Sequence, residues 1–264
     1  MNYMLLLSKK TITVTCLMCC SIALFAQTTE TSEAEILKQA NNPLASVKTF
    51  NVHNYYTPSL YGAPDATLNT AWLRYAQPFG RFIVRASLPV MTTSATGESP
   101  KSGLYDMNAF VIYKLSKNEG TELGIGPAIT FPTGTNGFGS GKWQGGISAV
   151  AFFKSNPVIQ VGSLLTWQTS FAGDEDKSDV NMLTPQIFFM WQIGGGTYLR
   201  STGIWSFDLE NGTYNVPIGL GIGKVLKTGN KVFNIFAEPQ YSVFAHGAGQ
   251  PKFQVFIGFN TQLH

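Results

Sequence analysis

Apolar and polar side chains alternate over two long stretches in the middle of the chain. The first stretch carries Ile159, Val161, Ser163, Leu165, Trp167, Thr169 and Phe171 on every second position, and the second carries Leu183, Pro185, Ile187, Phe189, Trp191 and Ile193. Thr184, Gln186 and Gln192 lie between the members of the second series. A period of two predicts strands with unlike faces. A membrane β-barrel hairpin shows this pattern, apolar toward lipid and polar toward a lumen, although a single hairpin of a soluble sandwich shows it too.

The same alternation continues along the rest of the chain and predicts about twelve strands of the length that a barrel needs. The predicted strands are Ser46–Tyr56, Leu68–Phe79, Phe82–Met91, Leu104–Leu115, Glu122–Phe131, Lys142–Lys154, Val158–Phe171, Val180–Ile193, Thr197–Phe207, Thr213–Val225, Lys231–Phe244 and Lys252–Leu263. Short turns alternate with longer loops between them. The pattern therefore predicts an all-β fold, a transmembrane antiparallel up-and-down β-barrel with short periplasmic turns and longer outer loops.

Charged residues separate the membrane barrel from a soluble sandwich. From Phe82 onward we expect the apolar faces of the strands to be free of charge, as in the series Phe82, Val84, Ala86, Leu88 and Val90. The charges that fall on the opposite faces are Arg85, Asp106, Lys114, Glu122, Arg200 and Glu238. A charge on the lipid face costs about 2–4 kcal/mol at mid-depth, whereas a soluble sandwich places charges on its outer face.

Aromatic and proline residues add two expectations. Aromatic side chains predicted near the outer rim are Trp143, Trp167, Phe171, Trp205, Phe207, Tyr214 and Tyr241, and those near the inner rim are Phe153, Trp191 and Phe233; such belts mark lipid interfaces. Bulges or strand ends are expected at Pro89, Pro127, Pro185, Pro217 and Pro239, because proline donates no ladder hydrogen bond. The first two strands give no clear phase, so Trp72 and Arg74 are not assigned to a face.

Composition and the beginning of the chain agree with export. Charged residues make up 12% of the 264 residues, about half of the roughly 25% usual for soluble domains. Residues 1–26 resemble a signal peptide, with Lys9 and Lys10 before an apolar stretch that ends near Ala26. Residues 27–45 form an N-terminal polar segment that stays in the periplasm or enters the barrel base, and a flexible leader explains it equally well. Residues 46–264 form the barrel. All three cysteines lie before position 21, so the mature chain has no disulfide.

The sequence indicates no enzyme, cofactor or metal site. The formal net charge of +3 gives no electrostatic argument for nucleic acid binding. Ser170, Asp179 and His246 could meet at the outer rim as a hydrolase triad, but loop residues of these types are common. The acidic stretch from Asp174 to Asp179 carries oxygen ligands that suit calcium, but a solvated loop is the favoured explanation.

Arg85, Arg200 and Glu238 are the charged residues predicted to lie deepest in the lumen. They could form a constriction that selects solutes, and two positive groups against one negative group would favour anions. They could equally be a paired cluster that fills a narrow lumen.

Several segments, in this order, resemble those of one bacterial outer-membrane family. They are Asn42-Pro43-Leu44-Ala45, Gly126-Pro127, Phe131-Pro132-Thr133, Lys142-Trp143, Ser170-Phe171-Ala172-Gly173-Asp174, Ser178-Asp179-Val180-Asn181 and Val216-Pro217-Ile218. The chain resembles the family labelled MetA-pathway of phenol degradation. The resemblance implies a transporter-like barrel and small aromatic compounds as solutes.

Taken together, the sequence predicts an outer-membrane channel or transporter for small solutes, aromatic or hydrophobic compounds among them. The alternative is a structural or interaction barrel that acts through its surface loops. The expected partners are outer-membrane lipid, the barrel assembly machinery and a small-molecule solute.

Overall fold

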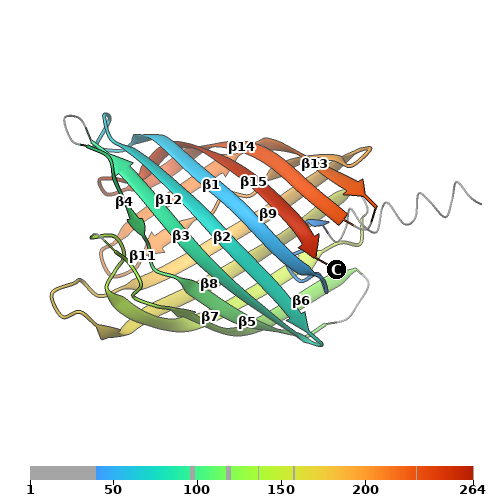
Figure 1. The fold of residues 1–264 in the computed structure, drawn as a ribbon, viewed down its shortest axis with the longest axis horizontal. Helices are drawn as coiled ribbons and strands as arrows, with labels where there is room; N and C mark the ends of the chain where they lie inside the picture. The colour runs from blue at the N-terminus through green and yellow to red at the C-terminus, as the bar shows by residue number, and fades with distance from the viewer. Residues whose placement is uncertain are drawn as a thin grey trace, which may run out of the picture. The chain divides into compact units, whose positions relative to one another are not determined.

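The computed structural model describes residues 40–263, apart from 96–98, 117–119, 136, 157 and 230. These residues form a barrel of long, strongly tilted strands (Figure 1). The strands are β1 Lys48–Leu60, β2 Thr67–Phe79, β3 Phe82–Ser94, β4 Lys101–Leu104, β5 Asn108–Lys114, β6 Thr121–Thr130, β7 Lys142–Phe153, β8 Ile159–Gly173, β9 Asn181–Gly194, β10 Thr197–Ser201, β11 Ser206–Asp208, β12 Thr213–Gly219, β13 Gly221–Thr228, β14 Lys231–His246 and β15 Pro251–Leu263. The predicted signal peptide and residues 27–39 lie outside the described residues.

Twelve positions in the wall account for the fifteen strands. Three pairs of strands each share one position: β4 and β5 both pair with β3, β10 and β11 both pair with β9, and β12 and β13 both pair with β14. All pairings are antiparallel, and β1 pairs with β15 from Lys48↔Leu263 to Leu60↔Pro251 to close the barrel. The predicted twelve-stranded antiparallel barrel is therefore confirmed.

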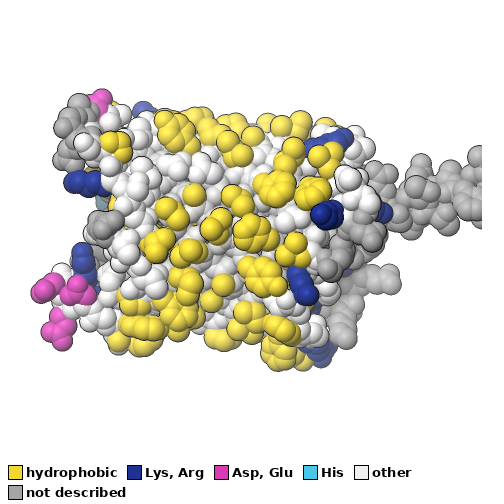
Figure 2. All heavy atoms as spheres, viewed as in Figure 1, with side chains coloured by type: hydrophobic (Ala, Val, Ile, Leu, Met, Phe, Trp, Pro, Cys, Tyr) yellow, Lys and Arg dark blue, Asp and Glu magenta, His cyan; other side chains and the backbone are white. Residues whose placement is uncertain are grey.

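The outer wall is apolar, as the alternation predicts. Ile187 on β9 is 40% exposed and Leu220, between β12 and β13, is 68% exposed, whereas the Gln186 side chain faces inward and donates to Thr202 O. Apolar side chains cover the wall while charged side chains gather at the two ends (Figure 2). Among the described residues, no helix is both long and apolar enough to cross a membrane. The apolar wall of a closed barrel places the protein in the bacterial outer membrane.

Two lysines correct the expectation that the outward faces carry no charge. Lys224 follows Ile222 on the outward side of β13, and Lys231 begins the outward series of β14. Both lie near the short turn between β13 and β14, and Lys224 Nζ donates to Gly195 O and to Thr197 Oγ1. A long side chain close to the membrane edge can carry its charge to polar groups there, which lowers the cost of the outward position.

The strand prolines remain inside their own strands, and the irregularity falls largely in the pairing with the neighbouring strand. Pro89, Pro185 and Pro239 lie opposite the gaps between β4 and β5, between β10 and β11, and between β12 and β13. The β5–β6 ladder is interrupted beside Pro127, and the pairing of β12 with β14 shifts at Pro217. A missing N–H removes one ladder bond, and the partner strand bends away at that point.

The described end of the N-terminal segment lies inside the barrel. Leu44 is 1% exposed and packs in one cluster with Ile83, Ile112, Val150 and Leu164, all of which face inward. These residues lie toward the end of the barrel that has the short turns and both ends of the described chain. Residues 40–45 therefore lie within the barrel base.

Candidate functional site

An aromatic cluster fills one side of the lumen at mid-height. Tyr55, Phe236 and Phe256 are buried, with Trp72 and Ile204 packed against them. The rings of Tyr55 and Phe256 stack at 4.1 Å between centroids, and Phe236 meets Phe256 edge to face at 4.8 Å. These rings pack against one another on this side of the lumen as side chains do in a protein core.

Arg200 and Glu238 form a buried ion pair next to this cluster. Arg200 Nε donates to Glu238 Oε2 at 2.8 Å, and the two residues are 5% and 0% exposed. Glu238 also accepts from Thr202 N, Thr202 Oγ1 and Gln240 Nε2 at 2.7, 2.8 and 2.9 Å. The Arg200 guanidinium lies 3.4 Å from the Phe236 ring centroid. Both charges are thus paired with each other and with surrounding groups.

Gly221 lies between Arg200 and Glu238 and lets them meet. Arg200 is the register partner of Gly221, and an added Cβ at Gly221 would lie 2.6 Å from the Glu238 Cβ. Real Cβ atoms do not approach so closely, so a side chain here would displace Glu238. The inward glycine is therefore a condition for the ion pair across β13.

A cavity of about 240 Å³ occupies another part of the lumen. The residues that line it come from β2, β3, β5, β6, β8 and β9 and from the segment before β11. They are Trp72, Arg74, Arg85, Ser87, Asn108, Ala109, Phe110, Ala128, Leu164, Thr166, Gln168, Thr184, Gln186 and Ile204. The lining contains two arginines and no carboxylate.

Arg74 and Arg85 are held by aromatic and imidazole groups rather than by acids. The Arg74 guanidinium lies 4.6 Å from the Trp72 ring centroid, and its Nη1 is 2.8 Å from His53 Nδ1. The Arg85 guanidinium lies 4.1 Å from the Phe110 ring centroid. Within the described ranges neither forms a salt bridge with a carboxylate. The cavity therefore carries a net positive charge.

Toward the periplasmic end of the barrel, the cavity ends at the cluster around Leu44. Leu164 belongs to that cluster and Phe110 packs against it, and both also line the cavity. Asn42 Nδ2 donates to Glu122 Oε2 at 3.0 Å and Asn234 Nδ2 to Asn41 Oδ1 at 3.0 Å, which fix the entering peptide to the wall. Residues 41–45 thus separate the cavity from the periplasmic end of the lumen.

The three predicted selectivity residues all face inward, and the structure divides them. Arg200 and Glu238 come together in the ion pair, whereas Arg85 faces the cavity with Arg74. Their role in selectivity stays a prediction. Sequence reasoning missed Arg74 and His53, because Asn69, Ala71 and Gln77 weaken the apolar series on the outward face of β2. The signal in the sequence was the pair of large apolar residues on either side of Arg74, Leu73 and Tyr75, and both are exposed on the outer wall.

Among the described residues, hydrogen bonds join only two of the three residues considered as a rim triad. Ser170 Oγ donates to Asp179 Oδ1 at 3.1 Å, but Asp179 also pairs with Lys142 Nζ at 3.1 Å, and His246 stacks on Tyr214. The hydrogen bonds from Lys142 and Ser170 lower the pKa of Asp179. The described part of the chain has no group of three or more His, Cys, Asp or Glu placed to hold a metal ion.

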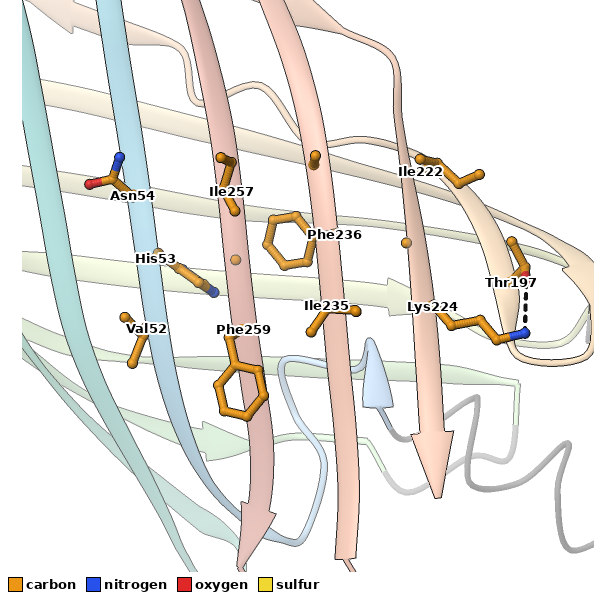
Figure 3. Close-up of a pocket in the computed structure, with 13 residues that line it drawn as sticks. Val52, His53, Asn54, Thr197, Ile222, Lys224, Ile235, Phe236, Ile257 and Phe259 are labelled. Carbon is orange, nitrogen blue, oxygen red and sulfur yellow. Dashed lines mark hydrogen bonds between the residues drawn. The ribbon is translucent and has the colours of Figure 1, made fainter. Parts of the chain in front are cut away.

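A second hollow, of about 650 Å³, lies against the wall formed by β1, β13, β14 and β15. Its lining includes outward-facing Val52, Ile222, Ile235, Ile257 and Phe259, carried by adjacent strands (Figure 3). Ala237 is small and lies between its register partners, Ile222 on β13 and Ile257 on β15, so the surface is depressed there. This hollow belongs to the lipid-facing surface, in contrast to the cavity beside Arg74 and Arg85.

Two solved outer-membrane channels have a similar fold. An outer membrane channel from Pseudomonas putida F1 superposes with a TM-score of 0.60 and 13% identity, covering 85% of this chain and 98% of that one. The NanC porin superposes with a TM-score of 0.54 and 9% identity, covering 81% of this chain and 99% of that one. No protein-family model and no curated protein sequence matches the chain. At these identities the likeness shows the fold, that of an outer-membrane β-barrel.

Proposed function

We propose that the protein is an outer-membrane channel for small solutes, including compounds with an aromatic or other apolar body. The observation that supports this most directly is the lumenal cavity, because its walls combine cationic, neutral polar and apolar groups. Pockets that bind small molecules have this mixed lining. A barrel that served only as a structural support could fill its lumen completely with side chains.

Residues 41–45 would act as the periplasmic gate of this channel. They are part of no strand and attach to the wall mainly through Leu44 and the Asn41 and Asn42 side chains. Burial of one leucine contributes about 1.5–3 kcal/mol and each hydrogen bond about 1 kcal/mol. A segment held by so few contacts can leave the lumen without disturbing the ladder of the wall.

Leu44→Ser combined with Asn42→Ala is expected to raise solute flux through the barrel. The two substitutions remove the apolar anchor and the hydrogen bond to Glu122, whereas all wall residues remain. Flux of small uncharged and charged solutes into proteoliposomes measures the effect. Leu209→Ser, in the exposed connection between β11 and β12, is the matched control and should leave flux unchanged. Equal flux for the double variant and the native chain would contradict the gate.

The channel is also expected to prefer anions, because Glu238 neutralises Arg200 while Arg74 and Arg85 have no acidic partner among the described residues. Replacing both Arg74 and Arg85 with glutamine should shift the reversal potential toward cations in planar bilayers. The channel proposal would be refuted if neither the native barrel nor the Leu44→Ser, Asn42→Ala variant showed conductance or solute flux after insertion. The alternative, a barrel acting through its surface loops, would then apply.

A further inference from the structure

The cavity contains buried polar groups that have no partner in the described protein. Ser87 is 2% exposed, and its Oγ makes no hydrogen bond. Arg74 Nε and Arg85 Nε are also buried without an acceptor. Unpaired buried donors are rare in folded proteins, because each loses its bonds to water without replacement. Three such donors on neighbouring strands β2 and β3 indicate a position for an acceptor from outside the chain.

The acceptor that suits these groups is a carboxylate. A guanidinium presents several N–H donors in a plane, and this arrangement matches the two oxygens of a carboxylate. Arg74 pairs in register with Ser87, and Arg85 pairs with Ala76, two residues after Arg74, so the three side chains belong to one small area of the wall. An anion there would meet two positive charges and no negative side chain of the lining.

The remainder of the lining suits an apolar body attached to that anion. Trp72, Phe110, Leu164 and Ile204 contribute apolar surface. One face of the Trp72 ring lies beside Arg74, and one face of the Phe110 ring lies beside Arg85. The cationic and apolar parts of the cavity lining are therefore next to each other. A fully hydrated inorganic anion would leave this apolar surface without a matching partner.

Several neutral polar side chains of the lining already have partners within the wall. Thr166 Oγ1 lies 2.8 Å from Ser148 Oγ, Gln168 is hydrogen-bonded to Thr130, and Gln186 donates to Thr202 O. These groups have hydrogen-bond partners without a ligand, whereas Ser87 and the two arginines have donors that a ligand could bind. The donors without a partner are therefore grouped in the part of the cavity lined by β2 and β3.

We propose that this cavity is a binding site for a small organic monocarboxylate with an apolar body of about one ring. The cavity of about 240 Å³ lies just below the range of roughly 300–1,000 Å³ for sites that take drug-sized ligands, which sets the size limit. The carboxylate binds Arg74, Arg85 and Ser87, and the apolar body contacts Phe110, Leu164 and Ile204. The inference rests on the proposed channel function for the route by which the ligand reaches the lumen.

Titration calorimetry on the full-length purified barrel tests the site with four probes: benzoate, benzyl alcohol, acetate and inorganic phosphate. Benzoate should bind most tightly, because benzyl alcohol lacks the charge, acetate lacks the ring and phosphate lacks the apolar body. Arg85→Gln and Arg74→Gln should each weaken benzoate binding about 10- to 100-fold, the range expected when a charge-assisted hydrogen bond is lost. Arg81→Gln removes a cation on the turn before β3, outside the cavity, and should leave binding unchanged.

A second variant distinguishes loss of the binding site from loss of folding. Asn108→Asp changes few atoms and places a carboxylate in the cavity lining, opposite Ser87 in the β3–β5 register. The new carboxylate should pair with Arg74 and Arg85 and abolish benzoate binding while the barrel remains folded. Benzoate binding that persists in Asn108→Asp and in the Arg74→Gln, Arg85→Gln double variant would overturn the proposal. Equal affinity for phosphate and benzoate would also overturn it, in favour of a site for inorganic anions only.

These outcomes are independent of the flux measurements. Binding without flux would refute the channel and leave the site, whereas flux without benzoate binding would refute the site and leave the channel.

Discussion

Glu238→Ala is expected to destabilise the barrel by about 3–5 kcal/mol, the usual cost of leaving one member of a buried ion pair without its partner. Arg200 is 5% exposed, and its guanidinium lies on the Phe236 ring, so little solvent can replace the carboxylate. The substitution also removes the acceptor for Thr202 N, Thr202 Oγ1 and Gln240 Nε2. Urea titration of the refolded barrel in lipid vesicles measures the loss.

The matched control replaces both charges at once. Arg200→Met with Glu238→Leu removes the ion pair and leaves no buried charge, so it should cost less than Glu238→Ala alone. A Glu238→Ala barrel as stable as the native one would show that water reaches Arg200 and that the pair is not sealed. Equal damage from the single and double variants would instead indicate that shape, and not the unpaired charge, is responsible.

Ile187→Arg and Leu220→Arg are each expected to lower the free energy of unfolding of the barrel by about 2–4 kcal/mol, and so to impair its assembly. Both side chains are exposed on the wall, at 40% and 68%, and an arginine there would face acyl chains. Gln186 is adjacent to Ile187 in sequence but faces the lumen, so Gln186→Arg should reduce the folded fraction less than Ile187→Arg. The shift between folded and unfolded bands on a gel, before and after heating, reports the folded fraction.

Gln186→Arg also has a defined secondary effect. Gln186 lines the cavity that contains Arg74 and Arg85, so a third cation would repel them and would remove the bond to Thr202 O. We expect this loss to be smaller than that of Ile187→Arg, because the lumen has polar groups and the acyl region has none. If Gln186→Arg and Ile187→Arg abolish folding equally, the assignment of faces on β9 is wrong. Lys224 does not contradict this rule, because its ammonium reaches Gly195 O and Thr197 Oγ1 near the membrane edge.

The sequence by itself determined the class of fold and the face of most side chains. Alternation has a period of two in any strand, and lipid excludes charge from one face at mid-depth, so the pattern around Ile187 and Leu220 is set by local rules. The inward positions of Arg85, Arg200 and Glu238 follow from the same rules. These rules did not hold on β2, where Asn69 and Gln77 occupy outward positions and leave the phase of Arg74 undefined.

Only the tertiary structure decided which lumenal groups meet. Arg200 and Glu238 are 38 residues apart and contact each other because β10, β13 and β14 are adjacent and Gly221 has no side chain between them. Arg74 and Arg85 share a cavity without an acid for the same kind of reason, since the stagger of the strands fixes which inward residues have the same height. Entry of Leu44 into the base is also a tertiary outcome, because its pocket combines inward side chains of β3, β5, β7 and β8. Alternation records the face of each residue, but it contains no information on neighbours across a lumen.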